Sequence, residues 1–396
     1  MEEDNSGVTG SGLRSSVHLP PEPAWRVVVR KAARVAAFFG ALYFFLTSIA
    51  MMEAAFGAFS RGYEGFWMLL IGSTSNPLVG LFVGILVTSV IQSSSATTSM
   101  VVALVASKPE LLPNAIPIVM GANIGTTVTS TLVSLGHITR KKEFRRAISG
   151  AMLHDLFNII TVTVLLPIEL ATHYLQSTAS FLSSHLWGAS TVECRSPLKA
   201  ILCPVANAVV GLFGWLGPIG QGVAALVLAL AVLFVSLLVM VKLMRRAVAG
   251  RAENVLDRTL GRAPVLGILV GLVLTAIIQS SSVTTSMLVP LAGAGLLSLE
   301  QVFPITLGAN IGTTVTAILA SLATGPAGLT IALVHFLFNA TGVAIVYPFR
   351  PVRAVPMRLA RWLAERFAES RYYALAYVAC VFFAVPALFV LASRLF

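Results

Sequence analysis

The chain has 396 residues, of which 57% are apolar and only 11% are charged, and its formal net charge is +11 at pH 7. Soluble domains carry about 25% charged residues, so this composition excludes an ordinary soluble protein. The positive charge does not indicate nucleic-acid binding, because the basic residues gather in short segments beside long apolar runs, as the positive-inside rule describes for membrane proteins.

Apolar runs along the chain are long enough to cross or deeply enter a bilayer, whose hydrocarbon core takes about 20 helical residues to span. They lie near residues 35–57, 77–106, 115–135, 147–168, 205–241, 264–297, 302–323, 328–348 and 372–393. Their pattern is not the alternating one of transmembrane β-strands. The sequence therefore predicts an all-α polytopic membrane protein.

The runs and the polar segments between them divide the chain into consecutive parts. Residues 1–24 are polar and begin with acidic residues, which predicts a flexible cytoplasmic tail rather than a cleavable signal. The parts expected after it are a first transmembrane segment (25–65), a first repeat (66–170), an external loop (171–204), a linking span with a cytoplasmic loop (205–254), a second repeat (255–350), a basic segment (351–371) and a C-terminal transmembrane segment (372–396).

Two of the three cysteines lie in the expected external loop. Cys194 and Cys203 are nine positions apart, a separation that can close a disulfide and would place the loop in an oxidising compartment. Two unpaired thiols are the alternative. Cys380 lies in the last apolar run and is expected to pack as an apolar side chain.

The two repeats carry the same motifs 187 positions apart. Gln92–Met100, QSSSATTSM, returns as Gln279–Met287, QSSSVTTSM. The block Gly121–Thr129, GANIGTTVT, returns unchanged as Gly308–Thr316. Duplicated, hydroxyl-rich segments that are broken by glycine in apolar surroundings are typical of the substrate site of a secondary transporter.

Charge placement predicts that the two repeats are inverted. If the basic cluster at 26–34 is cytoplasmic and the next run crosses outward, the first repeat enters the membrane from outside. The second repeat follows the basic cluster at 242–262 and enters from the cytoplasm, which gives the inverted architecture of many transporters. The pairs Gly80/Gly84 and Gly267/Gly271 have the spacing of close helix packing. The segment at 350–371 is either an internal loop or an interfacial amphipathic helix.

The polar motifs are expected to form broken or re-entrant helices at a central binding site. Irregular backbone at membrane depth is tolerated only where it lines a cavity or is buried in protein. Broken half-helices offer N–H groups to an anion, whereas the oxygens of the GANIGTT blocks suit sodium. Neither motif block contains Lys or Arg. Bound cations would then supply the positive charge that the anion needs, which is a physical route to sodium coupling.

Asp155 and two histidines are ionisable side chains within apolar runs of these repeats. Asp155 is deep in an apolar run, where a carboxylate costs roughly 2.5–3.5 kcal/mol and needs a partner. We interpret it as a cation site, and a structural hydrogen bond or a protonated carboxyl group is the alternative. His154 and His335 are matched between the repeats. We expect them to be hydrogen-bonded between helices, with ligation as the alternative.

The paired motifs resemble those of the type II sodium-phosphate cotransporter family, as do residues 144–147, 154–158 and 165–174. The short sequence is similar to a compact bacterial-type member. The resemblance implies sodium-driven uptake of inorganic phosphate by alternating access, with phosphate held between the two Gln-Ser-Ser-Ser turns. It also implies a multi-pass protein of the plasma (inner) membrane with a cytoplasmic N-terminus. An aspartate at the position of Asp155 marks the electrogenic members.

The site residues follow from the motifs and the resemblance together. The phosphate ligands expected are Ser93, Ser94, Ser95, Ser280, Ser281 and Ser282. The sodium ligands expected are Gln92, Gln279, Asn123, Thr126, Thr131, Asp155, Asn158, Asn310, Thr313 and Thr316. No cofactor is expected beyond sodium as a cotransported substrate. The expected partners are phosphate, sodium and the lipid bilayer, and not nucleic acid.

A symporter, rather than an enzyme, is therefore the predicted function, with three rivals. One is a symporter for another oxyanion, and another is an ion channel, whose flux sodium would not drive uphill. The third is an intramembrane serine hydrolase using Ser94 or Ser281 with His154 or His335. Catalysis needs one pair of nucleophile and base, whereas both candidates here are duplicated, which argues against the hydrolase.

Overall fold

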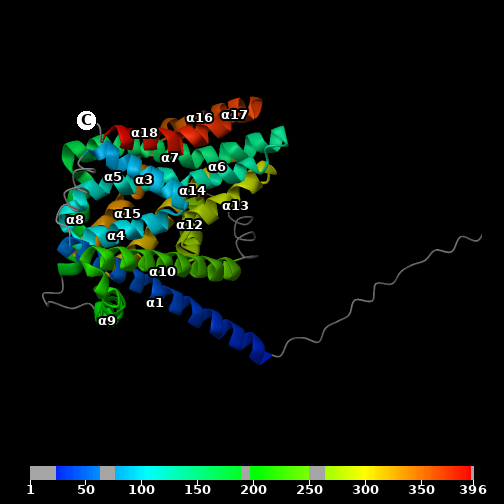
Figure 1. Cartoon of the computed structure of the whole chain (residues 1–396). Helices are drawn as coiled ribbons and strands as arrows, with labels where there is room; N and C mark the ends of the chain where they lie inside the picture. The colour runs from blue at the N-terminus through cyan, green and yellow to red at the C-terminus, as the bar shows by residue number, and fades with distance from the viewer. Residues whose placement is uncertain (1–23, 63–75, 189–196, 249–263, 394–396) are drawn as a thin grey trace, which may run out of the picture.

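The computed structural model describes residues 24–62, 76–188, 197–248 and 264–393, and these ranges contain helices and no strand (Figure 1). The α-helices are α1 (Ala24–Gly62), α3 (Pro77–Ile91), α4 (Ser94–Ser107), α5 (Leu112–Thr126), α6 (Val128–Leu135), α7 (Lys141–Thr172), α8 (Tyr174–Gly188), α9 (Pro197–Gly211), α10 (Gly217–Val248), α12 (Pro264–Ile278), α13 (Ser281–Gly293), α14 (Leu299–Ser321), α15 (Pro326–Val346), α16 (Arg350–Glu369), α17 (Arg371–Ala379) and α18 (Val385–Ala392). Short 3₁₀ turns cover Pro109–Leu111 and Gly214–Leu216, and a π-helical turn covers Cys380–Ala384.

Within these ranges, seven helical segments are long and apolar enough to cross a membrane, judged by length and composition. They are Val28–Met52, Pro109–Leu135, Lys141–Thr172, Gly214–Met240, Leu299–Ser321, Pro326–Val346 and Arg371–Ala392. The chain is therefore an all-α, multi-pass membrane protein, as its composition predicts.

The apolar runs at 77–106 and 264–297 are not single spans, because each is divided into two short helices. Thr88 Oγ1 of α3 donates a hydrogen bond to Thr97 Oγ1 of α4 at 3.0 Å. In a continuous helix these two residues would be about 13.5 Å apart along the axis. The chain therefore folds back between α3 and α4. The matching bond from Thr275 Oγ1 to Thr284 Oγ1, at 2.9 Å, folds α12 against α13 in the same way.

Glycines let one helix of each hairpin approach the next helix of its repeat closely. A Cβ atom added at Gly84 of α3 would collide with the main-chain oxygen of Ile118 in α5. One added at Gly271 of α12 would collide with the main-chain oxygen of Ile305 in α14. These contacts confirm the packing role predicted for the Gly-x-x-x-Gly pairs. The two repeats thus have the same helix arrangement around these glycines, and their inversion across the membrane stays a prediction.

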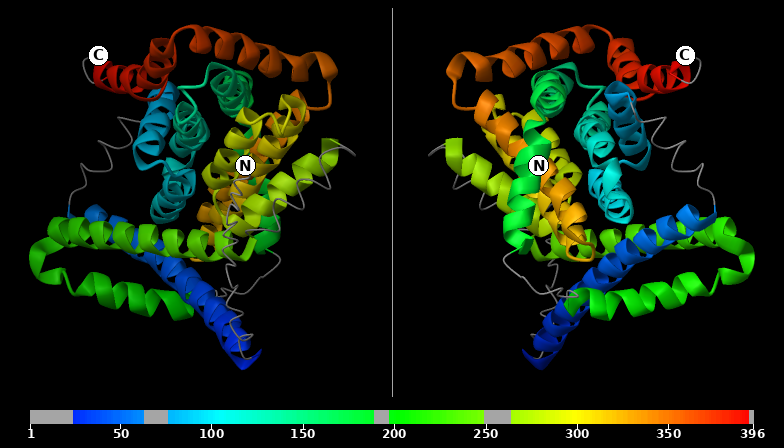
Figure 2. Two further views of the ribbon diagram at one scale, coloured as in Figure 1. Left: turned by 90° about the vertical axis from the view of Figure 1, so that its right-hand side faces the viewer. Right: turned by 90° about the vertical axis from the view of Figure 1, so that its left-hand side faces the viewer.

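The remaining helices surround the repeats. In Figure 2, α16, α17 and α18 lie along one edge of the molecule, and α1, α9 and α10 lie along the opposite edge. Helix α1 packs extensively against α10. Of the two alternatives for residues 350–371, the structure has the helix. Pro356, Ala360, Ala364 and Phe367 of α16 are buried at helical spacing, whereas most of its arginines are exposed.

The segment 171–204, expected to be a loop, is partly helical. Glu169 near the end of α7 accepts hydrogen bonds from the main-chain N–H groups of Leu175, at 2.5 Å, and Gln176, at 3.2 Å. These N–H groups begin α8 and have no partner within the helix, so the carboxylate caps it. Ser183 of α8 donates a hydrogen bond to the main-chain oxygen of Pro326, which attaches this helix to the start of α15.

Candidate functional site

Each predicted Gln-Ser-Ser-Ser segment forms a sharp turn at the tip of a hairpin. Gln92 ends α3 in the left-handed conformation, with a φ of 56°, and Gln279 ends α12 with a φ of 59°. A residue other than glycine in this conformation is strained by roughly 1–2 kcal/mol. The repeated strain, at two positions that also begin the repeated motif, indicates that the turn geometry has a function.

The serine after each glutamine caps the next helix. Ser93 Oγ accepts a hydrogen bond from the N–H of Ala96 at 3.2 Å, and Ser280 Oγ accepts one from the N–H of Val283 at 3.3 Å. The N–H groups of the intervening first-turn residues have no acceptor within their helix. Together with the helix dipole, they make the start of each helix favourable for an anion.

The two turns meet although 187 positions separate them. Ser95 Oγ of the first repeat donates a hydrogen bond to the main-chain oxygen of Gln279 in the second, at 3.3 Å. The same hydroxyl lies 3.5 Å from Thr316 Oγ1 of α14. The helix starts of both repeats therefore border one space.

That space is a cavity of about 760 Å³, which we call the central cavity. Its apolar wall includes Phe234, Leu237 and Leu238 of α10. Within the described part of the chain, no charged residue lines this cavity. Its polar lining consists of Gln92, Ser93, Ser95, Thr129, Gln279, Ser280, Ser282 and Ser286.

Some polar atoms in this lining are buried without a protein partner. Gln279 Oε1, Thr129 Oγ1 and Ser286 Oγ have no hydrogen bond within the described part of the chain. A buried polar atom without a partner costs about 1–3 kcal/mol, so such atoms are expected to have a ligand or water. These three oxygens are candidates to contact the transported ions.

The predicted phosphate ligands divide into two groups. Ser93, Ser95, Ser280 and Ser282 line the central cavity, whereas Ser94 and Ser281 do not. Both of these exceptions are buried. The main-chain oxygen of each accepts a hydrogen bond from a threonine hydroxyl one helical turn later.

Among the predicted sodium ligands, only the two glutamines line the central cavity. The hydroxyls of Thr126, Thr131 and Thr313 donate to main-chain oxygens four residues earlier in their own helices. Such back-bonding is the ordinary behaviour of threonine in a membrane helix. Thr316 differs, because it lies beside Ser95 where the two repeats meet.

The predicted asparagine ligands take part in a hydrogen-bond network between the repeats. His154 Nε2 of α7 lies 2.6 Å from Asn310 Oδ1 of α14. Asn310 Nδ2 donates to Asn158 Oδ1 at 2.7 Å, and Asn158 Nδ2 donates to the main-chain oxygen of Asn123 at 2.9 Å. All four side chains are buried.

The reciprocal contacts are made by the equivalent residues of the other repeat. His335 Nε2 of α15 lies 3.3 Å from Asn123 Oδ1, and Asn339 Nδ2 donates to the same oxygen at 3.2 Å. In both halves, a histidine and an asparagine four residues apart contact the asparagine of the opposite GANIGTT block. The histidines thus have the interhelical hydrogen bonds that we expected. The asparagine oxygens that could bind sodium are engaged within the protein.

Asp155 does not line the central cavity and has hydrogen-bond partners of its own. Thr127 Oγ1 donates a hydrogen bond to Asp155 Oδ1 at 2.8 Å, and Tyr377 Oη of α17 donates a short one to Oδ2. The carboxylate is fully buried. Its two donors satisfy part of its hydrogen-bonding capacity, and it still carries oxygen lone pairs for a cation.

The predicted disulfide is not supported. Cys203 is a free thiol in the structure, as is Cys380, and Cys194 lies outside the described residues. Cys380 is exposed rather than packed inside the protein, and it begins the π-helical turn that interrupts the last span.

Sequence reasoning missed several residues at these sites. Thr129 was within the repeated block, and Ser286 was within the repeated motif, so duplication was an available signal for both. Thr127 and Tyr377 contact Asp155, but Tyr377 is 222 positions away along the chain. No local pattern connects those two residues.

Comparison with known proteins gives consistent matches. The model of the family described as Na+/Pi-cotransporter matches residues 44–183 and 221–355. The chain is 33% identical over 443 residues to sodium-dependent phosphate transport protein 2B of Homo sapiens, with 89% of this chain and 64% of the relative covered. It is 33% identical over 429 residues to protein 2A of Rattus norvegicus, with 90% and 67% covered.

The chain is also 33% identical, over 449 residues, to sodium-dependent phosphate transport protein 2B of Pongo abelii, with 91% of this chain and 65% of the relative covered. The chain thus spans about two thirds of the length of the curated relatives that it matches. No solved structure matches the chain.

Proposed function

Because the chain belongs to the Na+/Pi-cotransporter family, we propose that it is a sodium-coupled symporter that imports inorganic phosphate. The family is one of transporters, not enzymes. The observation that carries the proposal is the central cavity, where helix starts from both repeats border one uncharged space. Hydroxyls of Ser93, Ser95, Ser280 and Ser282, with nearby N–H groups, would hold the phosphate oxygens.

Sodium supplies what the protein lining lacks. A phosphate ion carries one or two negative charges near neutral pH, and no lysine or arginine in the described part of the chain lines the central cavity. An unpaired anion in such surroundings is unfavourable, so sodium bound nearby would stabilise it. Gln92 and Gln279 stand at the cavity wall and are the sodium ligands that this geometry supports best.

Movement of one repeat against the other would give alternating access. The repeats contact each other through Ser95 at the cavity and through the two matched sets of histidine and asparagine contacts, which lie outside the cavity lining. Alternating access between two such bundles needs contacts that can exchange as they rock. We place the protein in the plasma (inner) membrane, as the family resemblance implies, with the cytoplasmic N-terminus that charge placement predicts.

Asp155 is the basis for proposing an electrogenic cycle. A buried carboxylate that binds an additional sodium would let net charge accompany divalent phosphate. Asp155→Gly is therefore expected to lower the charge moved per phosphate. Unchanged current per phosphate in that variant would remove its cation role.

The structure gives no support to a serine hydrolase. His154 hydrogen-bonds to Asn310 and His335 to Asn123, and neither histidine hydrogen-bonds to a serine within the described part of the chain. A nucleophile needs a base within hydrogen-bond reach. A symporter of another oxyanion stays an alternative, and competition by sulfate and arsenate against phosphate uptake separates the two.

The direct test is phosphate uptake into proteoliposomes with an inward sodium gradient. We expect accumulation above equilibrium with sodium, and only equilibration when potassium replaces it. Equal uptake in the two salts would contradict sodium coupling. Accumulation of sulfate with equal efficiency would contradict the substrate assignment while leaving the coupling intact.

A further inference from the structure

A second cavity, which we call the basic recess, lies apart from the central cavity. Its volume is about 370 Å³, and it is an open recess bordered by α7, α16 and the connection between α13 and α14. The polar side chains that line it are Arg145, Arg146, Ser149, Ser298, Arg361 and Glu365. Pro290 of α13 lines the central cavity and Ala292 lines the recess, so the two cavities share one helix.

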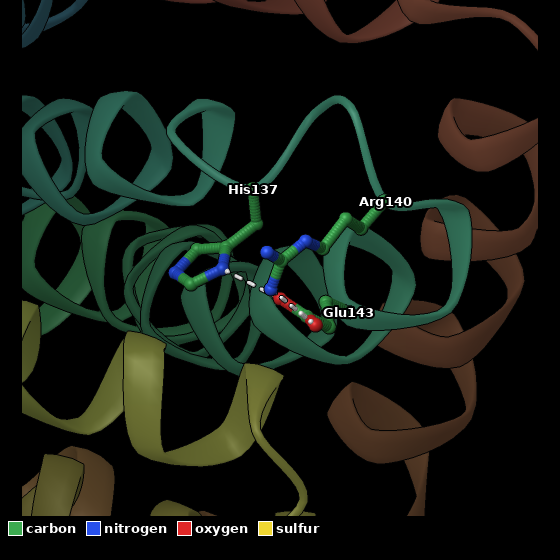
Figure 3. Close-up of polar contacts among 3 residues, drawn as sticks. All are labelled: His137, Arg140 and Glu143. Carbon is green, nitrogen blue, oxygen red and sulfur yellow. Dashed lines mark hydrogen bonds and ion pairs between the residues drawn. The ribbon is translucent and has the colours of Figure 1, made fainter. Parts of the chain in front are cut away.

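Two arginines in the recess are available for a ligand. No carboxylate lies within ion-pair distance of Arg145 or Arg146 among the described residues. The nearest acidic residue on their helix, Glu143, is already engaged. Arg140 Nη1 lies 2.9 Å from Glu143 Oε1, and His137 Nδ1 lies 3.5 Å from Oε2 (Figure 3).

The guanidinium of Arg146 lies close to Gly295, at a position where only glycine fits. Gly295 has a φ of 77°, and a Cβ added there would lie 2.5 Å from Arg146 Nη1. Glycine thus allows both the tight turn and the close approach of the guanidinium. Arg361 reaches the recess from α16 and pairs with Glu300 at 2.5 Å, which holds its side chain in place.

Exposed apolar side chains lie next to the residues that line the recess. Trp362 and Leu359 of α16 are exposed, and so is Leu296 in the connection after α13. Tryptophan and arginine together on an amphipathic helix are typical of the interface between lipid headgroups and acyl chains. A lipid could therefore place its phosphate in the recess and its chains on this apolar surface.

We propose that the basic recess binds a phosphate group, and that an anionic lipid supplies it. Arginine presents a planar fork of N–H donors that matches phosphate oxygens, and the buried Ser149 lies at the same site. Basic pockets between membrane helices are suited to acidic headgroups. The inference does not depend on phosphate transport, because it concerns residues outside the central cavity.

The test is lipid binding to the full chain in phosphatidylcholine nanodiscs, titrated with phosphatidylglycerol and read by native mass spectrometry. The variant Arg145→Gln/Arg146→Gln removes two recess charges. The matched control Arg358→Gln/Arg366→Gln removes two exposed charges from α16 outside the recess. The variant Arg145→Lys/Arg146→Lys keeps both positive charges but removes the planar guanidinium donors. Phosphatidylglycerol binding should be roughly 30-fold weaker in the first variant, because each arginine loses a hydrogen bond to the phosphate group that contributes about 1 kcal/mol.

We expect the control to bind as the unaltered chain does and the lysine variant to bind with intermediate strength. An equal loss in the glutamine variant and the control would show diffuse attraction and overturn the site. A second titration contains inorganic phosphate at millimolar concentration. Displacement of the lipid there would overturn the lipid as the source while keeping the phosphate site, and no displacement supports the lipid.

Discussion

The close contact of α5 with the first hairpin makes Gly125 a sensitive position. A Cβ atom added at Gly125 would lie 2.6 Å from the main-chain oxygen of Ile85 and 2.8 Å from Thr88 Cβ. Favourable contacts between carbon atoms occur at about 3.5–4.0 Å, so Gly125→Ala must displace α3 or distort it. Overpacking of this kind costs about 1–3 kcal/mol. Thr88 also donates the bond that closes the hairpin, so the displacement would reach the turn at Gln92.

A matched control separates this collision from helix propensity. Alanine is better than glycine in a helix by about 1 kcal/mol. Gly40 of α1 has no atom near the position of an added Cβ, so Gly40→Ala gains the helix-propensity stabilisation without a collision. Gly312 in the second repeat has the same 2.6 Å contact as Gly125, here with Leu272. Gly312→Ala should therefore behave as Gly125→Ala does.

Thermal unfolding of the purified variants in one detergent measures the difference. We expect Gly125→Ala and Gly312→Ala to be less stable than Gly40→Ala by about 1–3 kcal/mol, which is roughly 2–12 °C in Tm. Both should also lower phosphate uptake. Equal Tm values for the three variants would refute the close approach of the helices and the reasoning built on it.

Three further predictions concern the polar contacts. Asn310→Leu removes the hydrogen-bond partner of the buried His154 imidazole and of the Asn158 amide, and thermal unfolding should show a loss of stability of about 1–3 kcal/mol. An unchanged Tm would contradict the network between the repeats. Tyr377→Phe removes a hydrogen bond to Asp155, and simultaneous recording of current and uptake should show altered charge per phosphate, whereas an unaltered ratio would separate the tyrosine from the ion site. Ser95→Ala should raise the KM for phosphate roughly fivefold, because a hydrogen bond to phosphate worth about 1 kcal/mol is lost. The control Ser107→Ala, at the far end of α4, should leave the KM unchanged. Similar KM values in the two variants would argue against Ser95 as a phosphate ligand.

The repeated motifs were the most informative part of the sequence. They predicted that each polar segment breaks its apolar run. The structure places the breaks at Gln92 and Gln279, and the hydroxyl side chains that follow lie in the first turns of α4 and α13. The motifs also predicted that the two turns share a site, and the contact from Ser95 to Gln279 confirms that they meet. Spacing alone indicated the glycine contacts, since residues four apart share one helix face.

The partners of individual side chains could not be predicted in the same way. The oxygens of Asn123 and Asn310 suited sodium by chemistry, but each is engaged by a histidine from the opposite repeat. Composition described 171–204 as a polar loop, whereas the carboxylate of Glu169 begins a helix there. These outcomes depend on residues that only the tertiary fold brings together.

The account rests on sodium supplying the positive charge for an anion in an uncharged cavity. Equilibrium binding of radioactive phosphate to the purified protein, compared in sodium chloride and potassium chloride at equal ionic strength, tests this without any gradient. We predict saturable binding in sodium that is at least about tenfold weaker in potassium, a difference of about 1.4 kcal/mol. Equal affinity in the two salts would contradict the account.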